Sequence, residues 1–259
     1  MDWKLTKSLY ILVFLLMNIA LVLMLYNKQQ EGVREIESTP NTLEQTNIDV
    51  SNVPSNFEPV EMNILTGEAA DFTNLEEVEA EDVESTEKGA ILSENLEGSD
   101  SELSMDASML SNFKDENLYR GDEYQYDDVM SSDNRILFTQ YFENYPIFSN
   151  EAAHISFSGE GNEVSAYQQG YISNLRENSY SDPTAVRDPM NCVADLYQRD
   201  RISEDAVVEN ARLGYYVILN DGEQIMLRPK WEFIITENDV EKTIYIDAIS
   251  ETEDIIESE

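Results

Sequence analysis

The longest apolar run of the chain lies at residues 9–26. It carries no charge, and Asn18 is its one strongly polar residue. A helix rises 1.5 Å per residue, so a run of this length spans the roughly 30 Å hydrocarbon core of a bilayer. The run ends in Leu-Met-Leu-Tyr and is followed by Asn-Lys-Gln-Gln, without the small residues that precede a signal-peptide cleavage point. The pattern therefore predicts a retained transmembrane helix rather than a cleaved signal peptide.

The segments on either side of this run predict its orientation. Lys4 and Lys7 precede it, and a long polar region follows. Short positive segments stay inside the cell, whereas long domains cross the membrane largely regardless of charge. We expect a cytoplasmic tail at residues 1–8, a transmembrane helix at 9–26 and an extracytoplasmic remainder. The protein would then be a single-pass protein of the cell membrane, with its C-terminal domain extracellular.

The first part of the predicted ectodomain has a weak hydrophobic pattern. Residues 27–46 are polar and predict a juxtamembrane spacer. Beyond residue 47, short apolar positions are interrupted by prolines and a glycine, which indicates short strands and turns. Carboxylates then dominate residues 76–87, and their mutual repulsion favours disorder or a solvated helix face. We predict an acidic, loosely ordered N-terminal subdomain over residues 47–134, with Leu110, Phe113 and Leu118 among its few apolar anchors.

The second part, residues 135–259, predicts a β-rich C-terminal subdomain. Residues 135–142, 154–158 and 163–172 are rich in β-branched and aromatic side chains, which is typical of strands. Asp188 followed by Pro189 has the pattern of a helix N-cap and first turn. Apolar residues then recur at helical spacing as far as about residue 199, which predicts one short amphipathic helix.

A hairpin and a third strand complete this subdomain. Residues 207–219 and 224–236 flank Asn-Asp-Gly, a strong hairpin signal because glycine tolerates the positive φ of the turn. In the second strand, apolar residues alternate with Arg228, Lys230 and Glu232, which predicts one buried face and one wet face. Pro229 lacks an N–H donor, so we expect this strand to be an edge or to carry a bulge. With a strand at residues 243–248, the fold class is α+β, a mainly antiparallel-sheet ectodomain with few helices.

Composition narrows the chemistry. The 53 acidic and 16 basic residues give a net charge of −37, which repels nucleic acid and anionic lipid headgroups. One cysteine, Cys192, allows no intramolecular disulfide, and one histidine, His154, leaves little room for histidine metal sites or a Ser-His-Asp triad. We expect no catalytic residue, no cofactor, no metal and no nucleic-acid partner. His154 is expected to face solvent and Cys192 to be a small buried hydrophobe.

Two groups of residues are candidates for interaction. Asn18 would hydrogen-bond to another helix within the membrane, or it is simply tolerated in a long apolar run. Tyr215, Tyr216 and Trp231 would form an aromatic protein-interaction surface, since aromatic residues are enriched in interface cores. The alternative for the aromatic group is packing within the hairpin core, which is favoured for Trp231.

Several motifs, taken in order, resemble the YycI (WalI) family. The start Met1-Asp-Trp-Lys runs into the apolar segment with Asn18, and the stretch from about residue 113 to 256 carries the rest. The motifs are Tyr119-Arg-Gly-Asp-Glu-Tyr, Phe138-Thr-Gln-Tyr-Phe with Pro146-Ile-Phe, Ala166-Tyr-Gln-Gln-Gly-Tyr-Ile, Leu196-Tyr-Gln-Arg-Asp-Arg-Ile, Leu213-Gly-Tyr-Tyr, Pro229-Lys-Trp-Glu and Tyr245-Ile-Asp-Ala.

The resemblance implies a non-enzymatic function. Members of this family are membrane-anchored regulators of the YycG/WalK sensor histidine kinase of a two-component system that controls cell-wall metabolism in Gram-positive bacteria. They pair with a sister protein, YycH, through the outer domain and contact the kinase through membrane helices. Two other functions remain open from the residues alone. They are a membrane-tethered sensor of an external ligand or divalent cation and, with no supporting motif, a wall-active hydrolase.

Overall fold

The structure is a computed structural model, and it describes residues 13–15, 17–18, 43, 46–73, 91–96, 103–148, 151–221, 224–252 and 255–258. Residues 13–15, 17–18 and 43 are helical, and the helices described from end to end are α3 Ala107–Asn117, α4 Pro189–Gln198 and the short 3₁₀ helices η2 Gly121–Glu123 and η3 Glu151–Ala153. The strands are β1 Glu61–Met62, β2 Leu65–Ala69, β3 Ile91–Asn95, β4 Tyr124–Tyr126, β5 Arg135–Phe142, β6 Tyr145–Phe148, β7 His154–Glu160, β8 Glu163–Gly170, β9 Ile172–Glu177, β10 Thr184–Ala185, β11 Val207–Asn220, β12 Ile225–Glu237, β13 Val240–Asp247 and β14 Ile256–Ser258.

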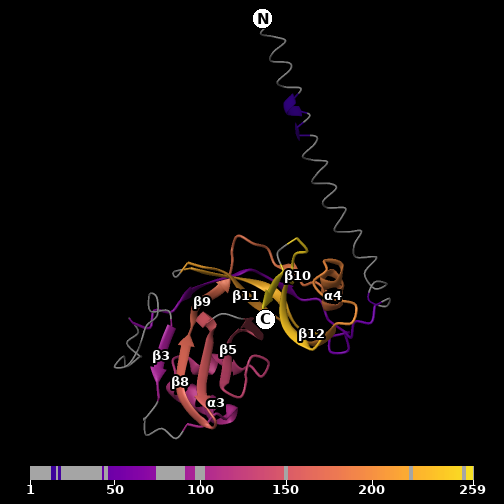
Figure 1. The fold of residues 1–259 in the computed structure, drawn as a ribbon. Helices are drawn as coiled ribbons and strands as arrows, with labels where there is room; N and C mark the ends of the chain where they lie inside the picture. The colour runs from indigo at the N-terminus through magenta and orange to yellow at the C-terminus, as the bar shows by residue number, and fades with distance from the viewer. Residues whose placement is uncertain are drawn as a thin grey trace, which may run out of the picture.

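Most of these strands join one twisted sheet. Its main path runs β14-β13-β12-β11-β6-β5-β7-β8-β3, with β4 beside β5 and β2 joining β12 to β9, while β1 and β10 form a separate pair (Figure 1). The named strands pair antiparallel except β6 and β11, which run parallel. The fold is therefore α+β and dominated by antiparallel sheet.

The strand and helix predictions for the second half are confirmed. β5, β7, β8, the long β11–β12 hairpin and β13 lie where the sequence placed them. Helix α4 begins as predicted, because the Asp188 carboxylate accepts a hydrogen bond from the backbone N–H of Met190 at 2.9 Å and Pro189 occupies the first turn. Its Cys192 is fully buried, as expected.

Between residues 47 and 134, the described segments contribute to the same sheets as the later strands. β1 pairs with β10, β2 pairs with both β9 and β12, and β3 pairs with β8. Helix α3, which the sequence did not predict, buries Leu110 and is capped by Asp106, whose side chain accepts from the backbone N–H of Met109. The boundary at residues 134 and 135 stays a prediction, since strands from both sides of it pair with each other.

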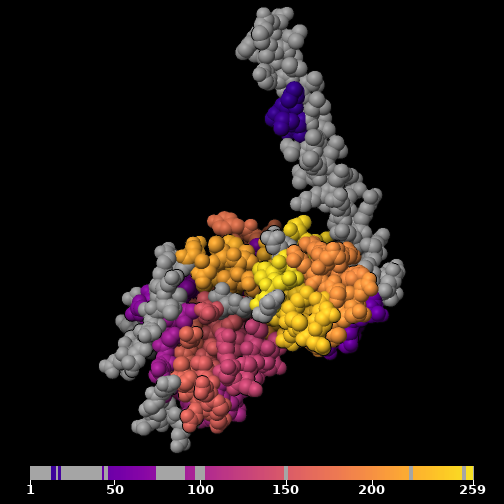
Figure 2. Space-filling model, viewed as in Figure 1, coloured from indigo at the N-terminus to yellow at the C-terminus, as the bar shows by residue number. Residues whose placement is uncertain are grey.

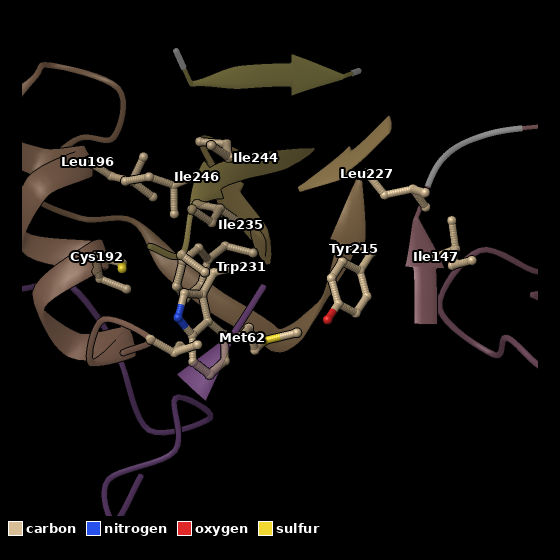
Figure 3. Close-up of a cluster of buried hydrophobic side chains, with 14 of the residues drawn as sticks. Met62, Ile147, Cys192, Leu196, Tyr215, Leu227, Trp231, Ile235, Ile244 and Ile246 are labelled. Carbon is tan, nitrogen blue, oxygen red and sulfur yellow. The ribbon is translucent and has the colours of Figure 1, made fainter. Parts of the chain in front are cut away.

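Two hydrophobic cores lie on either side of β6. The α4 core gathers side chains from β2, α4, β11, β12 and β13, and it includes Leu65, Val193, Leu227, Trp231, Phe233 and Ile244 (Figure 3). The α3 core gathers side chains from α3, β3, β4, β5, β7 and β8, and it includes Leu92, Leu110, Phe138, Ile155 and Phe157. In Figure 2 the orange-to-yellow surface lies against the magenta-to-pink one.

The prediction that the strand containing Pro229 is an edge is wrong, and the alternative, a bulge, is not found at the proline. The register shifts of its ladder with β11 lie between Val208 and Asn210 and between Val217 and Leu219, where the extra residue belongs to β11. β12 lies between β11 on one side and β2 and β13 on the other, and its register with β11 is continuous through Pro229. Pairing with β2 ends at Leu227 and pairing with β13 begins at Lys230. Pro229 accepts a hydrogen bond from the Ala248 N–H, so its backbone polar groups face this gap, where no ladder donor is needed.

The wet face predicted for β12 is also wrong. Lys230 and Glu232 are only 2% and 1% exposed, and the Arg228 side chain is mostly buried. The alternation itself is present, because Leu227, Trp231 and Phe233 point into the α4 core. The opposite face is buried too, since β6, the turn after β4 and neighbouring aromatic rings cover it.

The predicted membrane anchor falls largely outside the described residues. Val13–Leu15 and Met17–Asn18 are helical and exposed, while the tail at 1–8, the other positions of 9–26 and most of the spacer at 27–46 are not described. Within the described ranges, no helix has the length and apolarity needed to cross a membrane.

Candidate functional site

Asn18 lies on the described part of the N-terminal helix. Its side-chain Nδ2 donates a 2.7 Å hydrogen bond to the carbonyl oxygen of Phe14, one turn earlier. This contact satisfies one polar group of the amide within its own helix. The Oδ1 atom keeps its capacity to accept a hydrogen bond from another helix, so the interaction predicted for Asn18 stays a prediction.

The predicted aromatic surface is divided by the sheet. Trp231 and Tyr215 lie on the α4-core side and are 2% and 4% exposed (Figure 3). The Trp231 indole Nε1 donates to the carbonyl oxygen of Arg187 at 3.0 Å, and its ring packs edge-on against Phe57. The Tyr215 ring packs edge-on against Phe142. Both side chains thus contribute to packing in this chain.

Tyr216 points the other way, because successive residues of a strand face opposite sides of the sheet. It is half-buried, and its ring centroid lies 4.8 Å from that of Tyr245 on β13. Of the three predicted residues, Tyr216 is the one with a partly accessible ring. The structure therefore does not bring the three together on one surface, and their role in binding stays a prediction.

The polar side of the β11–β12–β13 sheet carries a buried charge network centred on Arg212. The Arg212 Nε donates to Glu232 Oε2 at 2.5 Å, directly across the β11–β12 ladder. Its Nη1 donates to Asp127 Oδ1 at 2.8 Å, and its guanidinium lies over the Phe148 ring. The remaining nitrogen, Nη2, is buried without a hydrogen-bond partner among the described residues.

Asp127 reaches this network from the α3-core side. Its backbone N–H donates to the Leu137 carbonyl, which extends the β4–β5 ladder by one residue. Its second carboxylate oxygen accepts from the Thr139 hydroxyl at 3.0 Å, and the carboxylate also accepts from the Met130 N–H. The Asp127 carboxylate is therefore held in place by residues of the α3-core side, independently of its ion pair with Arg212.

Glu232 carries the network on to β13, where the Tyr245 hydroxyl donates to its Oε1 at 3.1 Å. Burial raises the pKa of Glu232, and the hydrogen bonds from Arg212 and Tyr245 limit that rise. For Arg212, burial disfavours the charge, but Glu232 and Asp127 outweigh it and raise the guanidinium pKa further. Arg212 is thus permanently charged and held by two carboxylates.

A second buried ion pair lies beside the first. Arg228 Nε contacts Asp247 Oδ2, and Asp247 is fully buried opposite Lys230 in the β12–β13 register. Gly214 completes this row on β11, because a Cβ there would lie 2.5 Å from the Pro146 carbonyl oxygen and 2.6 Å from the Phe148 ring. The absent side chain lets β6 and its Phe148 ring cover the polar face.

His154 was expected to face solvent, and that expectation is wrong. It is 7% exposed, because β7 lies between β5 and β8 inside the sheet. Its Nε2 lies 3.2 Å from the Ile147 carbonyl oxygen, and burial lowers its pKa to about 4. The imidazole is therefore neutral at physiological pH and engaged in the structure.

The network was not predicted, because Arg228, Lys230 and Glu232 were expected to lie on a solvated face of the strand. Counting back from the predicted turn would place Arg212 opposite Trp231, and the observed pairing with Glu232 depends on the register shift between Val217 and Leu219. The approach of Asp127 could not be predicted either, since it depends on how the β4–β5 pair packs. Within the described ranges, no three histidine, cysteine or acidic side chains converge as a metal site.

Two solved structures are similar to parts of this chain. The Bacillus megaterium YpeB C-terminal domain shares 15% identity, over 61% of this chain and 68% of that one, with a TM-score of 0.36. The crystal structure of an uncharacterized protein from Eubacterium rectale ATCC 33656 shares 15% identity over 48% of this chain, with a TM-score of 0.31. This chain spans 43% of the Eubacterium rectale chain. No curated protein sequence matches.

The family comparison covers far more of the chain. The model of the YycI protein family matches residues 27–249, from just beyond the predicted anchor to two residues past the end of β13. Because this match covers most of the chain, the chain belongs to the YycI family.

Proposed function

We propose that this protein is a non-enzymatic regulator of the YycG/WalK sensor-kinase system, anchored in the cell membrane by residues 9–26. Its N-terminus would be cytoplasmic, and its sheet-dominated domain would lie outside the cell and pair with a YycH-like sister protein. The observation that carries the proposal is the YycI family match over residues 27–249. A regulator of this kind needs only to bind one state of a two-state kinase more tightly than the other.

The two side chains best suited to catalysis support a non-enzymatic role. Cys192 is fully buried within α4, and burial raises its thiol pKa to about 12, which keeps it protonated. His154 is buried against the Ile147 carbonyl. Neither group is accessible to a substrate, and the buried carboxylates Asp127 and Glu232 are both occupied by Arg212.

A helix exchange tests the proposal. Residues 9–26 are replaced by an unrelated single-pass helix of the same length, and the chain is purified from membranes that contain the sensor kinase. The kinase is expected to be lost from the purified material, while the YycH-like protein is retained through the outer domain. Kinase recovery equal to that of the parent chain would show that the anchor is only a tether.

Asn18→Leu refines the same experiment. Polar contacts between membrane helices average about 0.6 kcal/mol, so kinase recovery should fall about threefold if Oδ1 bonds to the kinase. Met17→Leu, an apolar exchange at the neighbouring exposed position, is the control and should leave recovery unchanged. Equal recovery with both variants would assign Asn18 to its own helix, through the Phe14 carbonyl alone.

A further inference from the structure

The two cores are joined by a narrow part of the sheet. β6 is four residues long, and it is the strand that links β5 to β11 in the main path. It pairs with β11 at two positions and with β5 at two positions. β11–β12 and β5–β7 pair over much longer stretches, so the backbone connection through β6 is short. A second connection runs through β2, which pairs with β12 and β9 and continues at Ala70, whose N–H donates to the Tyr171 carbonyl.

Side chains hold this junction on both faces of β5, and the two faces differ in chemistry. On one face, the Gln140 side chain makes two neutral hydrogen bonds of 2.9 Å with the backbone N–H and carbonyl of Ile172. On the other face, the neighbouring Thr139 holds Asp127, which binds Arg212 of β11. Adjacent residues of a strand face opposite sides of the sheet. Hydrogen bonds of the Gln140 amide therefore join the cores on one face, and the Asp127–Arg212 ion pair joins them on the other.

Of these two contacts, the ion pair is the one whose separation costs less free energy when the two cores move apart. Separation of Asp127 from Arg212 would return both charges to water, which offsets much of the lost attraction. It would also hydrate Arg212 Nη2, which is buried without a partner among the described residues. Arg212 would keep its bond to Glu232 within the β11–β12 hairpin. The Gln140 contacts gain no comparable hydration, because they involve neutral groups.

We propose that the Asp127–Arg212 ion pair is a latch between the two cores, and that its release lets them reorient about the Gln140–Ile172 contact. Arg212 is the moving part of the latch, since Asp127 is fixed to the α3-core side by Leu137, Thr139 and Met130. This inference concerns the fold itself and holds whichever partner the protein binds.

Hydrogen exchange of the full chain in detergent tests the latch. Asp127→Asn removes the charge of the ion pair and keeps the shape of the side chain. Amides of β6 and of the facing part of β11 should then exchange about tenfold faster or more, which corresponds to about 1.4 kcal/mol in a local opening equilibrium. Amides of β7 and β8, inside the α3 core, should keep the parent rate.

Asp195→Asn is the matched control. Asp195 binds two arginines, Arg187 at 3.0 Å and Arg199 at 2.7 Å, but all three belong to the α4-core side. This variant should speed exchange in α4 and leave β6 at the parent rate. An unchanged β6 in Asp127→Asn, or an equal acceleration of β6 by both variants, would overturn the latch.

A distance measurement reports the reorientation directly. Spin labels at Glu116→Cys on α3 and Gln198→Cys at the end of α4 occupy exposed positions, whereas the native Cys192 is buried. The distance distribution should broaden or shift with Asp127→Asn and not with Asp195→Asn. If Asp127→Asn does not fold, Arg212→Lys keeps the charge but lacks the fork that bridges two carboxylates. A parent-like distribution in that folded variant would overturn the proposal.

Discussion

At the scale of single residues, Gly214 shows how closely β6 approaches β11. Gly214→Ala would place a Cβ 2.5 Å from the Pro146 carbonyl oxygen, and backbone cannot move aside as a flexible side chain can. We expect a loss of about 1–3 kcal/mol in the free energy of unfolding, measured by urea denaturation. Gly161→Asn, at an open position with φ 65°, should cost much less, because asparagine tolerates the left-handed region.

His154 gives the protein a defined response to acid. Burial lowers its pKa from 6.5 to about 4, so the unfolded chain binds more protons than the folded one between these values. The contribution of neutral His154 to the free energy of unfolding is thus complete above pH 6.5 and is lost as the pH falls toward 4. At pH 5 the loss amounts to roughly 2 kcal/mol. In urea denaturation at pH 7 and pH 5, His154→Gln should lose correspondingly less stability than the parent. Equal losses would show that the imidazole is not neutral and buried as described.

At the scale of secondary-structure elements, the N-cap of α4 is a separable contribution. The Asp188 carboxylate accepts from the Met190 and Asn191 N–H groups, which have no partner within the helix. Asp188→Ala should lower the free energy of unfolding by about 1 kcal/mol, whereas Asp188→Asn retains the acceptor and should cost less. Urea denaturation of both variants separates the effect of the capping hydrogen bonds from that of the negative charge. Similar losses of unfolding free energy in the two variants would mean that the charge contributes more than the hydrogen bonds.

The elements that could be predicted are those whose signals are local. Helix α4 could be predicted from Asp188 and Pro189 together with the helical spacing of the apolar residues that follow. The β11–β12 hairpin could be predicted from its Asn-Asp-Gly turn. Helix α3 was missed because its stretch is polar and acidic, with Leu110 as its one fully buried apolar side chain. Alternation on β12 correctly assigned Trp231 to a core. It could not show that the opposite face is buried as well, because that depends on β6 and the Asp127 turn arriving from elsewhere in the chain.

At the scale of the whole molecule, the net charge of −37 opposes the compact state by self-repulsion. Raising NaCl from low to physiological concentration should screen this repulsion and raise Tm, with each kcal/mol corresponding to about 2–4 °C. Calcium and sodium chloride at matched ionic strength should have similar effects. A much larger rise with calcium would instead support the divalent-cation sensor that the sequence left open.

The position of Pro229 has a consequence for how the chain finds its fold. β2 and β13 are separated by about 170 residues of chain, yet they share one edge of β12 end to end. Each could in principle slide along that edge and displace the other. Proline offers no donor at the boundary, so a strand that advances over it gains only a bond to its carbonyl, which the Ala248 N–H already makes. One residue thereby assigns each competitor its own segment of β12, and it does so in the middle of a sheet, where proline is normally excluded.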